Sequence, residues 1–301
     1  MLATHWHDDH IGGLADLVDA CPNAKFCCAA PLVSSDFLDL LALFNKRPIS
    51  KATGLSEIQR VFSIVKNRRS HPSWLLEGSP VALLPEVGPA PEARITALSP
   101  VHAEYSRFIE SLAKHVPDAL ATKFKFPARD ENDISVAVTI TVGNIGVLLG
   151  ADLETRRDAN RGWNAVLSST TRSNQKSTLF KVPHHGSETG HHDGVWAEML
   201  IDEPVAVLTP WNRGSKLPTA GDRARTRGLA QRSFITSRIT DAPILPANYA
   251  VAKTIRESDI TISGADGVTG RITARLPLNA AIGQQHNWSI ELSDEASDLN
   301  Y

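Results

Sequence analysis

The sequence has few cysteines and no long apolar run. Its three cysteines are an odd number with two of them adjacent, which is a poor framework for disulfides, so we expect all three to be reduced: Cys21, Cys27 and Cys28. No uninterrupted apolar stretch approaches the roughly 20 residues that a membrane helix needs. No signal-peptide pattern follows Met1. We therefore expect a cytoplasmic protein with no membrane partner.

Net charge is also nearly absent. The formal net charge is -2 and the sequence pI is about 6.6. A chain this close to neutral has no global attraction for nucleic acid or acidic membranes, although a local basic patch stays open. With 42% hydrophobic and 21% charged residues, the composition is that of an ordinary soluble globular protein. We predict a single domain over residues 1–301, with a core of about 1–240 and a C-terminal extension with strands over 241–301.

Strand-like and helix-like segments alternate along the chain. Helices are expected from Leu14 to Cys21, in two segments of 34–69 divided near 48–53, and at 103–115, 154–167, 192–200 and 220–232. Strands are expected at 25–29, 94–98, 134–142, 145–149, 179–182, 205–209, 260–262, 270–276 and 288–292. Such alternation favours helices packed on sheets. Polar residues able to bind metal repeatedly follow a strand, where layered folds usually keep their sites.

The residues that carry chemistry begin at the N-terminus, in Thr4-His5-Trp6-His7-Asp8-Asp9-His10. Four candidate ligands fall within six positions: His5, His7, Asp9 and His10. Imidazole and carboxylate are natural ligands for zinc, iron or manganese. In an extended turn His5 and His7 project to one side, while Asp9 and His10 come from the start of a helix. One loop can therefore supply ligands to two neighbouring metals. The alternative is a solvated loop, for which Trp6 is a poor choice.

Three later segments continue the series. They are Leu148-Leu149-Gly150-Ala151-Asp152 at a strand end, Val182-Pro183-His184-His185-Gly186-Ser187, and Asn132-Asp133-Ile134-Ser135 before the predicted hairpin. Taken alone, Asp152 is equally suited to a helix N-cap, and the paired histidines to a polar turn. Their order along the chain favours a shared site.

The first loop, followed by Ile11-Gly12-Gly13-Leu14, is similar to the signature of the metallo-β-lactamase fold superfamily. The later segments resemble that superfamily too, in particular the branch that includes the hydrolase domain of the competence protein ComEC. The resemblance implies an α/β fold, a four-layer αββα sandwich. The superfamily normally begins with several strands before the histidine loop. We therefore expect either a sequence that lacks these strands or a first sheet that is built otherwise.

The resemblance also implies metal-assisted hydrolysis, with two metals holding a water whose pKa is lowered toward 7. Zinc is the expected metal, as one or two ions, with manganese or iron as alternatives. The first metal would be held by His5, His7 and one histidine of the His184-His185 pair, and the residues do not say which. The second would be held by Asp9 and His10, with Asp152 as the bridge. Asp9 would also orient the water or take its proton, and Lys181, Ser187 or the other histidine of the pair would stabilise negative charge, so that the expected catalytic residues are Asp9, His185 and Lys181.

One departure from that branch concerns the second metal. Where relatives carry a Gly-His-Pro element, this chain has Leu217-Pro218. Leucine cannot bind metal, so the second site would be left with Asp9, His10, Asp152 and water. A one-metal enzyme therefore stays open.

The substrate is the least specified part of this interpretation. The basic segment 222–232, with Arg213 and Lys216 nearby, slightly favours phosphodiester bonds of nucleic acid or nucleotides as the substrate. The alternatives are a hydrolase of thioesters, lactones or β-lactams, and a degenerate domain that binds a nucleotide or a partner without catalysis. The partner protein, if any, is not indicated.

Overall fold

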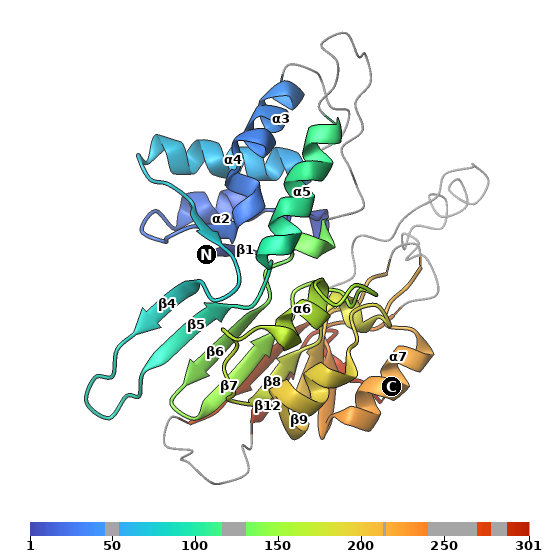
Figure 1. The fold of residues 1–301 in the computed structure, drawn as a ribbon. Coiled ribbons are helices and arrows are strands. Elements are labelled where there is room, and N and C mark those ends of the chain that lie inside the picture. Colours follow the sequence, from blue (N-terminus) through green and yellow to red (C-terminus); the bar gives the residue numbers. More distant parts are fainter. Residues whose placement is uncertain (46–53, 116–130, 213–214, 240–269, 278–287, 301) are drawn as a thin grey trace, which may run out of the picture.

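The computed structural model describes residues 1–45, 54–115, 131–212, 215–239, 270–277 and 288–300. Within these ranges the chain has a mixed α/β fold with a large eight-stranded sheet, a small three-stranded sheet and a two-stranded hairpin. Helices α2 to α5 gather beside the small sheet, and α6 and α7 lie along the large one (Figure 1). The predicted strand at 260–262 and Arg213 lie outside the described residues.

The N-terminal part of the chain forms the small sheet and most of the helices. Its strands are parallel, in the order β1 (Leu2–Ala3), β2 (Cys27–Ala29) and β3 (Ser73–Leu75). Between them lie α1 (Asp8–Ile11), α2 (Leu14–Ala20), η1 (Ala30–Val33), α3 (Ser35–Asn45) and α4 (Gly54–Asn67). Gly13, with a φ of 81°, separates α1 from α2, a left-handed conformation that glycine adopts without strain.

The large sheet has the order β13-β10-β9-β8-β7-β6-β5-β4. Its strands are β4 (Pro80–Leu84), β5 (Ala93–Ala97), β6 (Val138–Val142), β7 (Ile145–Leu149), β8 (Ser177–Lys181), β9 (Leu200–Leu208), β10 (Arg232–Ile235) and β13 (Ser297–Asp298). Strands β4 to β7 pair antiparallel, whereas β7 to β10 pair parallel. The connections include α5 (His102–His115), η2 (Asn132–Ile134), α6 (Gly162–Ser168), η3 (His184–Gly186), the π-helical turn η4 (Val195–Met199) and α7 (Ala220–Leu229).

Apolar residues cover both faces of the parallel part of the large sheet. On one face, Phe180 of β8 belongs to a buried cluster with Trp163 of α6 and Met199 of η4. On the other face, a cluster centred on Phe234 packs against Ile290 from the hairpin of β11 (Arg271–Arg275) and β12 (Ser289–Ser293). Parallel strands are normally buried on both sides in this way.

A separate buried cluster joins the small sheet to the helices and to the ends of β5 and β6. Trp6 belongs to this cluster, and its ring centroid lies 5.6 Å from those of both Phe37 of α3 and Phe108 of α5. The histidine loop is therefore anchored to the core through its tryptophan, in agreement with the expectation that Trp6 does not belong to a mobile loop.

Most predicted elements are present, but several boundaries differ. The strand expected over 134–142 begins only at Val138, because residues 132–134 form the 3-10 turn η2 and Ser135 turns its side chain toward the histidine loop. The helix expected over 154–167 is reduced to α6. Gly162, with a φ of 53°, lies against the carbonyl group of Glu154, and this close approach holds the preceding residues in a loop.

Candidate metal centre

Three chain segments bring the candidate ligands together, and each follows the end of a strand. The histidine loop and α1 follow β1, Asp152 follows β7, and His184-His185 follow β8. Since β7 and β8 are parallel neighbours, their carboxyl ends meet at one edge of the sheet. Backbone hydrogen bonds fix the segments to one another: Val136 N donates to Thr4 O over 3.0 Å, and His184 N donates to Ala151 O over 3.1 Å.

The first group of candidate ligands consists of His5, His7 and Asp152. Their ligand atoms all lie within 4.8 Å of one another. His5 Nε2 lies 3.0 Å from His7 Nδ1, and His5 is fully buried. Burial lowers the pKa of His5 well below its ordinary value, and the charge of His10 lowers it further. A histidine held neutral in this way is ready to bind a metal, because only neutral imidazole has a free lone pair.

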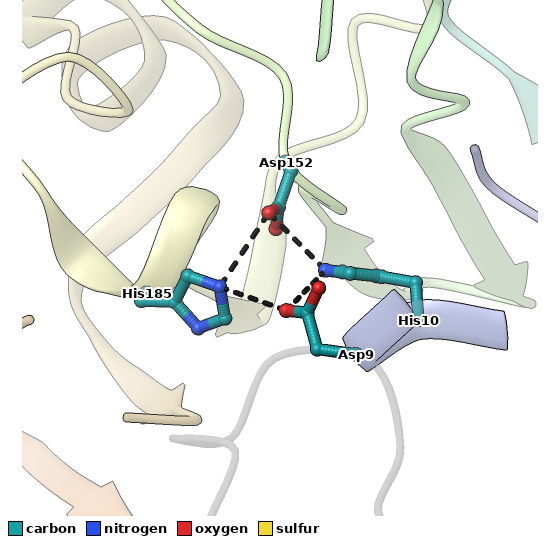
Figure 2. Close-up of side chains that lie close together, drawn as sticks. All are labelled: Asp9, His10, Asp152 and His185. Atoms are coloured by element: carbon teal, nitrogen blue, oxygen red, sulfur yellow. Dashed lines mark ion pairs between the residues drawn. The ribbon is translucent and has the colours of Figure 1, made fainter. Parts of the chain in front are cut away.

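The second group consists of Asp9, His10, Asp152 and His185, whose side chains point toward one another (Figure 2). His10 Nε2 lies 3.1 Å from Asp152 Oδ2 and 3.4 Å from Asp9 Oδ2. His185 Nε2 lies 3.2 Å from Asp9 Oδ2 and 3.6 Å from Asp152 Oδ2. Two imidazole nitrogens and two carboxylates converging in this way form a donor set that suits zinc, iron or manganese.

Asp152 belongs to both groups and is the most buried of the carboxylates, with 2% of its side chain exposed. Burial alone would raise its pKa, but the hydrogen bond from His10 and the charges of His10 and Lys181 lower the pKa far below its ordinary value. Among the described residues its Oδ1 has no hydrogen-bond partner, and Lys181 Nζ is 4.0 Å away. A buried carboxylate oxygen without a partner is costly, and a divalent cation would satisfy it. The residues therefore fit a metal.

The structure distinguishes the two histidines of the pair, which the sequence leaves equivalent. His185 Nδ1 lies 3.0 Å from Thr209 O, and this contact turns Nε2 toward Asp9 and Asp152. His184 Nδ1 instead lies 3.0 Å from Glu154 Oε1, outside both groups. Both residues have left-handed backbones, with φ of 45° for His184 and 55° for His185. Strained backbone of this kind is frequent at functional sites.

His185 lies with Asp9 and His10, whereas the sequence predicts a histidine of the pair beside His5 and His7. The second group thus contains His185 as a further candidate ligand, although Leu217 cannot serve as one. Leu217 pairs with Trp211 through two backbone hydrogen bonds, and the Trp211 ring lies 5.7 Å from the His185 ring. The assignment of each ligand to a metal stays a prediction.

Lys181 lies at the end of β8 beside Asp152. Its Nζ donates to Ala151 O over 3.3 Å. Burial lowers the pKa of Lys181, while the charges of Asp152 and Asp9 oppose that shift. Ser187 Oγ lies 3.0 Å from His184 Nδ1, and Ser187 belongs to neither group. Of these two side chains, the lysine lies next to Asp152, a member of both groups, whereas the serine lies next to His184, which belongs to neither.

Two acidic residues near the candidate ligands were not singled out from the sequence. Glu131 forms a close ion pair with His7, through Oε2 and Nε2. Glu154 lies beside His184 and accepts a hydrogen bond of 2.9 Å from Asn132 Nδ2. Their only sequence signal is proximity to motifs, since Glu131 directly precedes the Asn132 segment and Glu154 follows Asp152 by two positions.

The basic segment 222–232 lies on α7 and beyond. Arg225 donates to Gly186 O over 3.0 Å and pairs with Asp222 Oδ1 at 2.6 Å. This arginine therefore ties α7 to the loop of the histidine pair.

Comparison with known proteins finds a family match in the N-terminal part of the chain. The family model of the metallo-beta-lactamase superfamily matches residues 1–39, the stretch that contains the histidine loop. No curated protein matches the chain. Together, the family match and the two ligand groups suggest a metal-dependent hydrolase. None of the helices in the described ranges combines the length and the apolar character needed to cross a membrane.

Proposed function

We propose that this protein is a metal-dependent hydrolase with a metallo-β-lactamase fold, and that its centre is built on Asp152. The observation that carries the proposal is the meeting of two ligand groups on this one buried carboxylate. Side chains from three separate strand ends converge there, which a solvated histidine-rich loop would not require. The four-layer αββα sandwich and the relation to the ComEC branch are part of the proposal.

A divalent cation, which we propose to be zinc, would act there as a Lewis acid and lower the pKa of a water that it binds. Asp9 is suited to accept the proton of that water, because 27% of its side chain is exposed whereas Asp152 is enclosed. Burial would raise the pKa of Asp9, but the hydrogen bond from His185 and the charges of His10 and His185 lower it, so the carboxylate is ionised at neutral pH. Lys181 supplies a positive charge beside Asp152, with its Nζ 4.0 Å from Asp152 Oδ1.

We propose phosphodiesters of nucleic acid or nucleotides as the substrate class, with thioesters, lactones and β-lactams as the alternative. The support is the number of cationic groups near the centre: Lys181 next to Asp152, and the basic helix α7, which contacts the loop of the histidine pair through Arg225. Negatively charged substrates are attracted to such a region.

A substrate panel tests this proposal. The purified protein is supplied with Zn²⁺ or Mn²⁺ and assayed on a generic phosphodiester, a thioester, a lactone and a β-lactam. We expect phosphodiester hydrolysis that EDTA abolishes and that Asp152→Ala lowers by at least about 100-fold, since the carboxylate shared by both ligand groups would be lost and with it several kcal/mol of charge stabilisation. Asp193→Asn is the matched control, because Asp193 is 97% exposed and belongs to neither group.

The outcomes separate the alternatives. Hydrolysis of a different member of the panel, with the same dependence on Asp152, would replace the substrate class and keep the metallo-hydrolase. Folded protein with no metal-dependent turnover on any member, or equal rates in Asp152→Ala and Asp193→Asn, would contradict the proposal and favour a binding domain without catalysis.

A further inference from the structure

A single segment, Glu131 to Ser135, contacts all three residues of the first group of candidate ligands, His5, His7 and Asp152. Glu131 pairs with His7 Nε2. Ser135 Oγ lies 3.2 Å from His5 Nδ1 and accepts a hydrogen bond of 3.1 Å from the backbone N–H of Asp152. Neither residue belongs to the ligand groups themselves. The segment therefore lies immediately outside the centre and touches it at several points.

The contacts of His7 define which of its nitrogens faces the centre. Nδ1 lies 3.0 Å from His5 Nε2, inside the first group, whereas Nε2 points to the Glu131 carboxylate. In a neutral imidazole one nitrogen carries the proton and the other is free to bind. A carboxylate at Nε2 holds the proton there and leaves Nδ1 free. A carboxylate in this position also makes the imidazole a more basic ligand.

The contacts of His5 permit the opposite choice when a metal replaces the proton between its Nε2 and His7 Nδ1, which lie 3.0 Å apart. Its Nε2 faces the first group, and its Nδ1 faces two hydroxyl groups, Ser135 Oγ and Thr4 Oγ1, each at 3.2 Å. A proton on Nδ1 can be donated to either oxygen, which leaves Nε2 free to bind. Because Ser135 Oγ also accepts from Asp152 N, one fully buried hydroxyl fixes both the ring of one candidate ligand and the backbone of another.

From this geometry we infer that Glu131 and Ser135 are positioning residues of the metal centre, which fix the tautomers so that His7 presents Nδ1 and His5 presents Nε2. The inference rests on the proposed function for the presence of the metal. It adds two residues that bind neither metal nor substrate and act only through the ligands. Loss of such outer partners typically weakens metal binding by about 10–100-fold.

The test measures Zn²⁺ affinity by competition with a chelating dye, without substrate. We expect Glu131→Ala and Ser135→Ala each to raise the dissociation constant for Zn²⁺ by about 10–100-fold. Glu131→Gln, which keeps an acceptor oxygen, should bind Zn²⁺ more tightly than Glu131→Ala. Ser99→Ala is the matched control: Ser99 Oγ donates to Ser135 O over 2.6 Å and accepts from Ala137 N, so it removes a buried hydroxyl of the same network that contacts no ligand.

A second readout separates positioning from simple loss of structure. Nitrogen-15 chemical shifts of the metal-free protein, recorded at a pH high enough for His7 to be neutral, report which imidazole nitrogen carries the proton. We expect His7 to be protonated at Nε2 in the unmodified protein and to become a mixture of tautomers in Glu131→Ala. Glu131 is only partly buried, with 14% of its side chain exposed, and it belongs to none of the buried hydrophobic clusters, so this variant is expected to fold.

The inference is overturned if Glu131→Ala and Ser135→Ala bind Zn²⁺ as tightly as Ser99→Ala, or if the His7 tautomer is unchanged in Glu131→Ala. These results are independent of turnover. A protein that binds Zn²⁺ tightly, responds to both substitutions and hydrolyses no substrate would contradict the proposed function and leave the positioning roles in place. An active enzyme whose Zn²⁺ affinity is unaltered in the variants would support the proposed function and contradict the positioning roles.

Discussion

His5 and His7, two positions apart in one loop, are affected by the fold in opposite directions. Burial, followed by the charge of His10, lowers the pKa of His5 well below 6.5. Burial also acts to lower the pKa of His7, but the hydrogen bond and the charge of Glu131 outweigh it and the pKa is raised. The same residue type thus carries opposite pH dependences of stability at the two positions.

The pH dependence of His5 can be measured in metal-free protein. In the unfolded chain His5 binds a proton as the pH falls through about 6.5, whereas in the folded chain it stays neutral to lower pH. The free energy of unfolding therefore falls as the pH drops below about 6.5. His7 has the opposite sign: its contribution is present below about 6.5 and is lost as the pH rises through its raised pKa.

We expect the free energy of unfolding of the unmodified chain to fall more steeply between pH 6.5 and 5.5 than that of His5→Gln, by up to about 1.4 kcal/mol per pH unit. Urea denaturation in EDTA at several pH values measures both slopes. The substitution removes the contribution of His5 and leaves that of His7. The difference between the two slopes is therefore the contribution of His5 alone. Equal slopes would show that His5 is not a buried neutral histidine.

At the scale of elements, the N-terminus of α4 lies against the histidine loop. A Cβ atom on Gly54 would overlap the carbonyl oxygen of Trp6 and would lie 3.4 Å from Asp8 Oδ1. The helix can occupy this place only because residue 54 has no side chain. The loop that carries His5 and His7 is thus held in place by two contacts, that of the Trp6 side chain with the core and that of its backbone with α4.

Gly54→Ala should displace the loop. We expect it to lower the free energy of unfolding by about 1–3 kcal/mol, the usual cost of overpacking, and to weaken Zn²⁺ binding. Gly228→Ala in α7 is the control, since no described atom lies within 4 Å of a Cβ there. It should stabilise by up to about 1 kcal/mol through helix propensity. Chemical denaturation and Zn²⁺ competition measure both, and equal stability of the two variants would refute the close contact.

The strands show what sequence periodicity can and cannot predict. Alternation from Ile134 to Val142 predicted a strand, because side chains of a strand point to alternate faces, and only Val138–Val142 of this segment form one. It did not indicate that Ser135 lies before the strand, with its hydroxyl between His5 and Asp152. Those contacts depend on residues 130 and 17 positions away, and periodicity within one segment carries no information about them.

At the scale of the whole molecule, residue patterns select candidate ligands but do not say which of them lie together. Four close-set ligands in the loop have a local signal, and Asp152 and His185 follow strands. Which histidine of the pair faces the centre depends on the contact of His185 Nδ1 with Thr209 O at the end of another strand. Glu131 had no motif of its own. Partners brought together by tertiary structure are therefore what residue patterns missed.

The central claim is that Asp152 joins two ligand groups into one metal centre, and metal content measures it most directly. The purified protein is equilibrated with Zn²⁺, dialysed against metal-free buffer and analysed by plasma mass spectrometry. We expect the unmodified chain to keep about one to two Zn²⁺ per molecule, and folded Asp152→Ala to lose most of them. An unmodified chain that keeps no more Zn²⁺ than Asp152→Ala would contradict it.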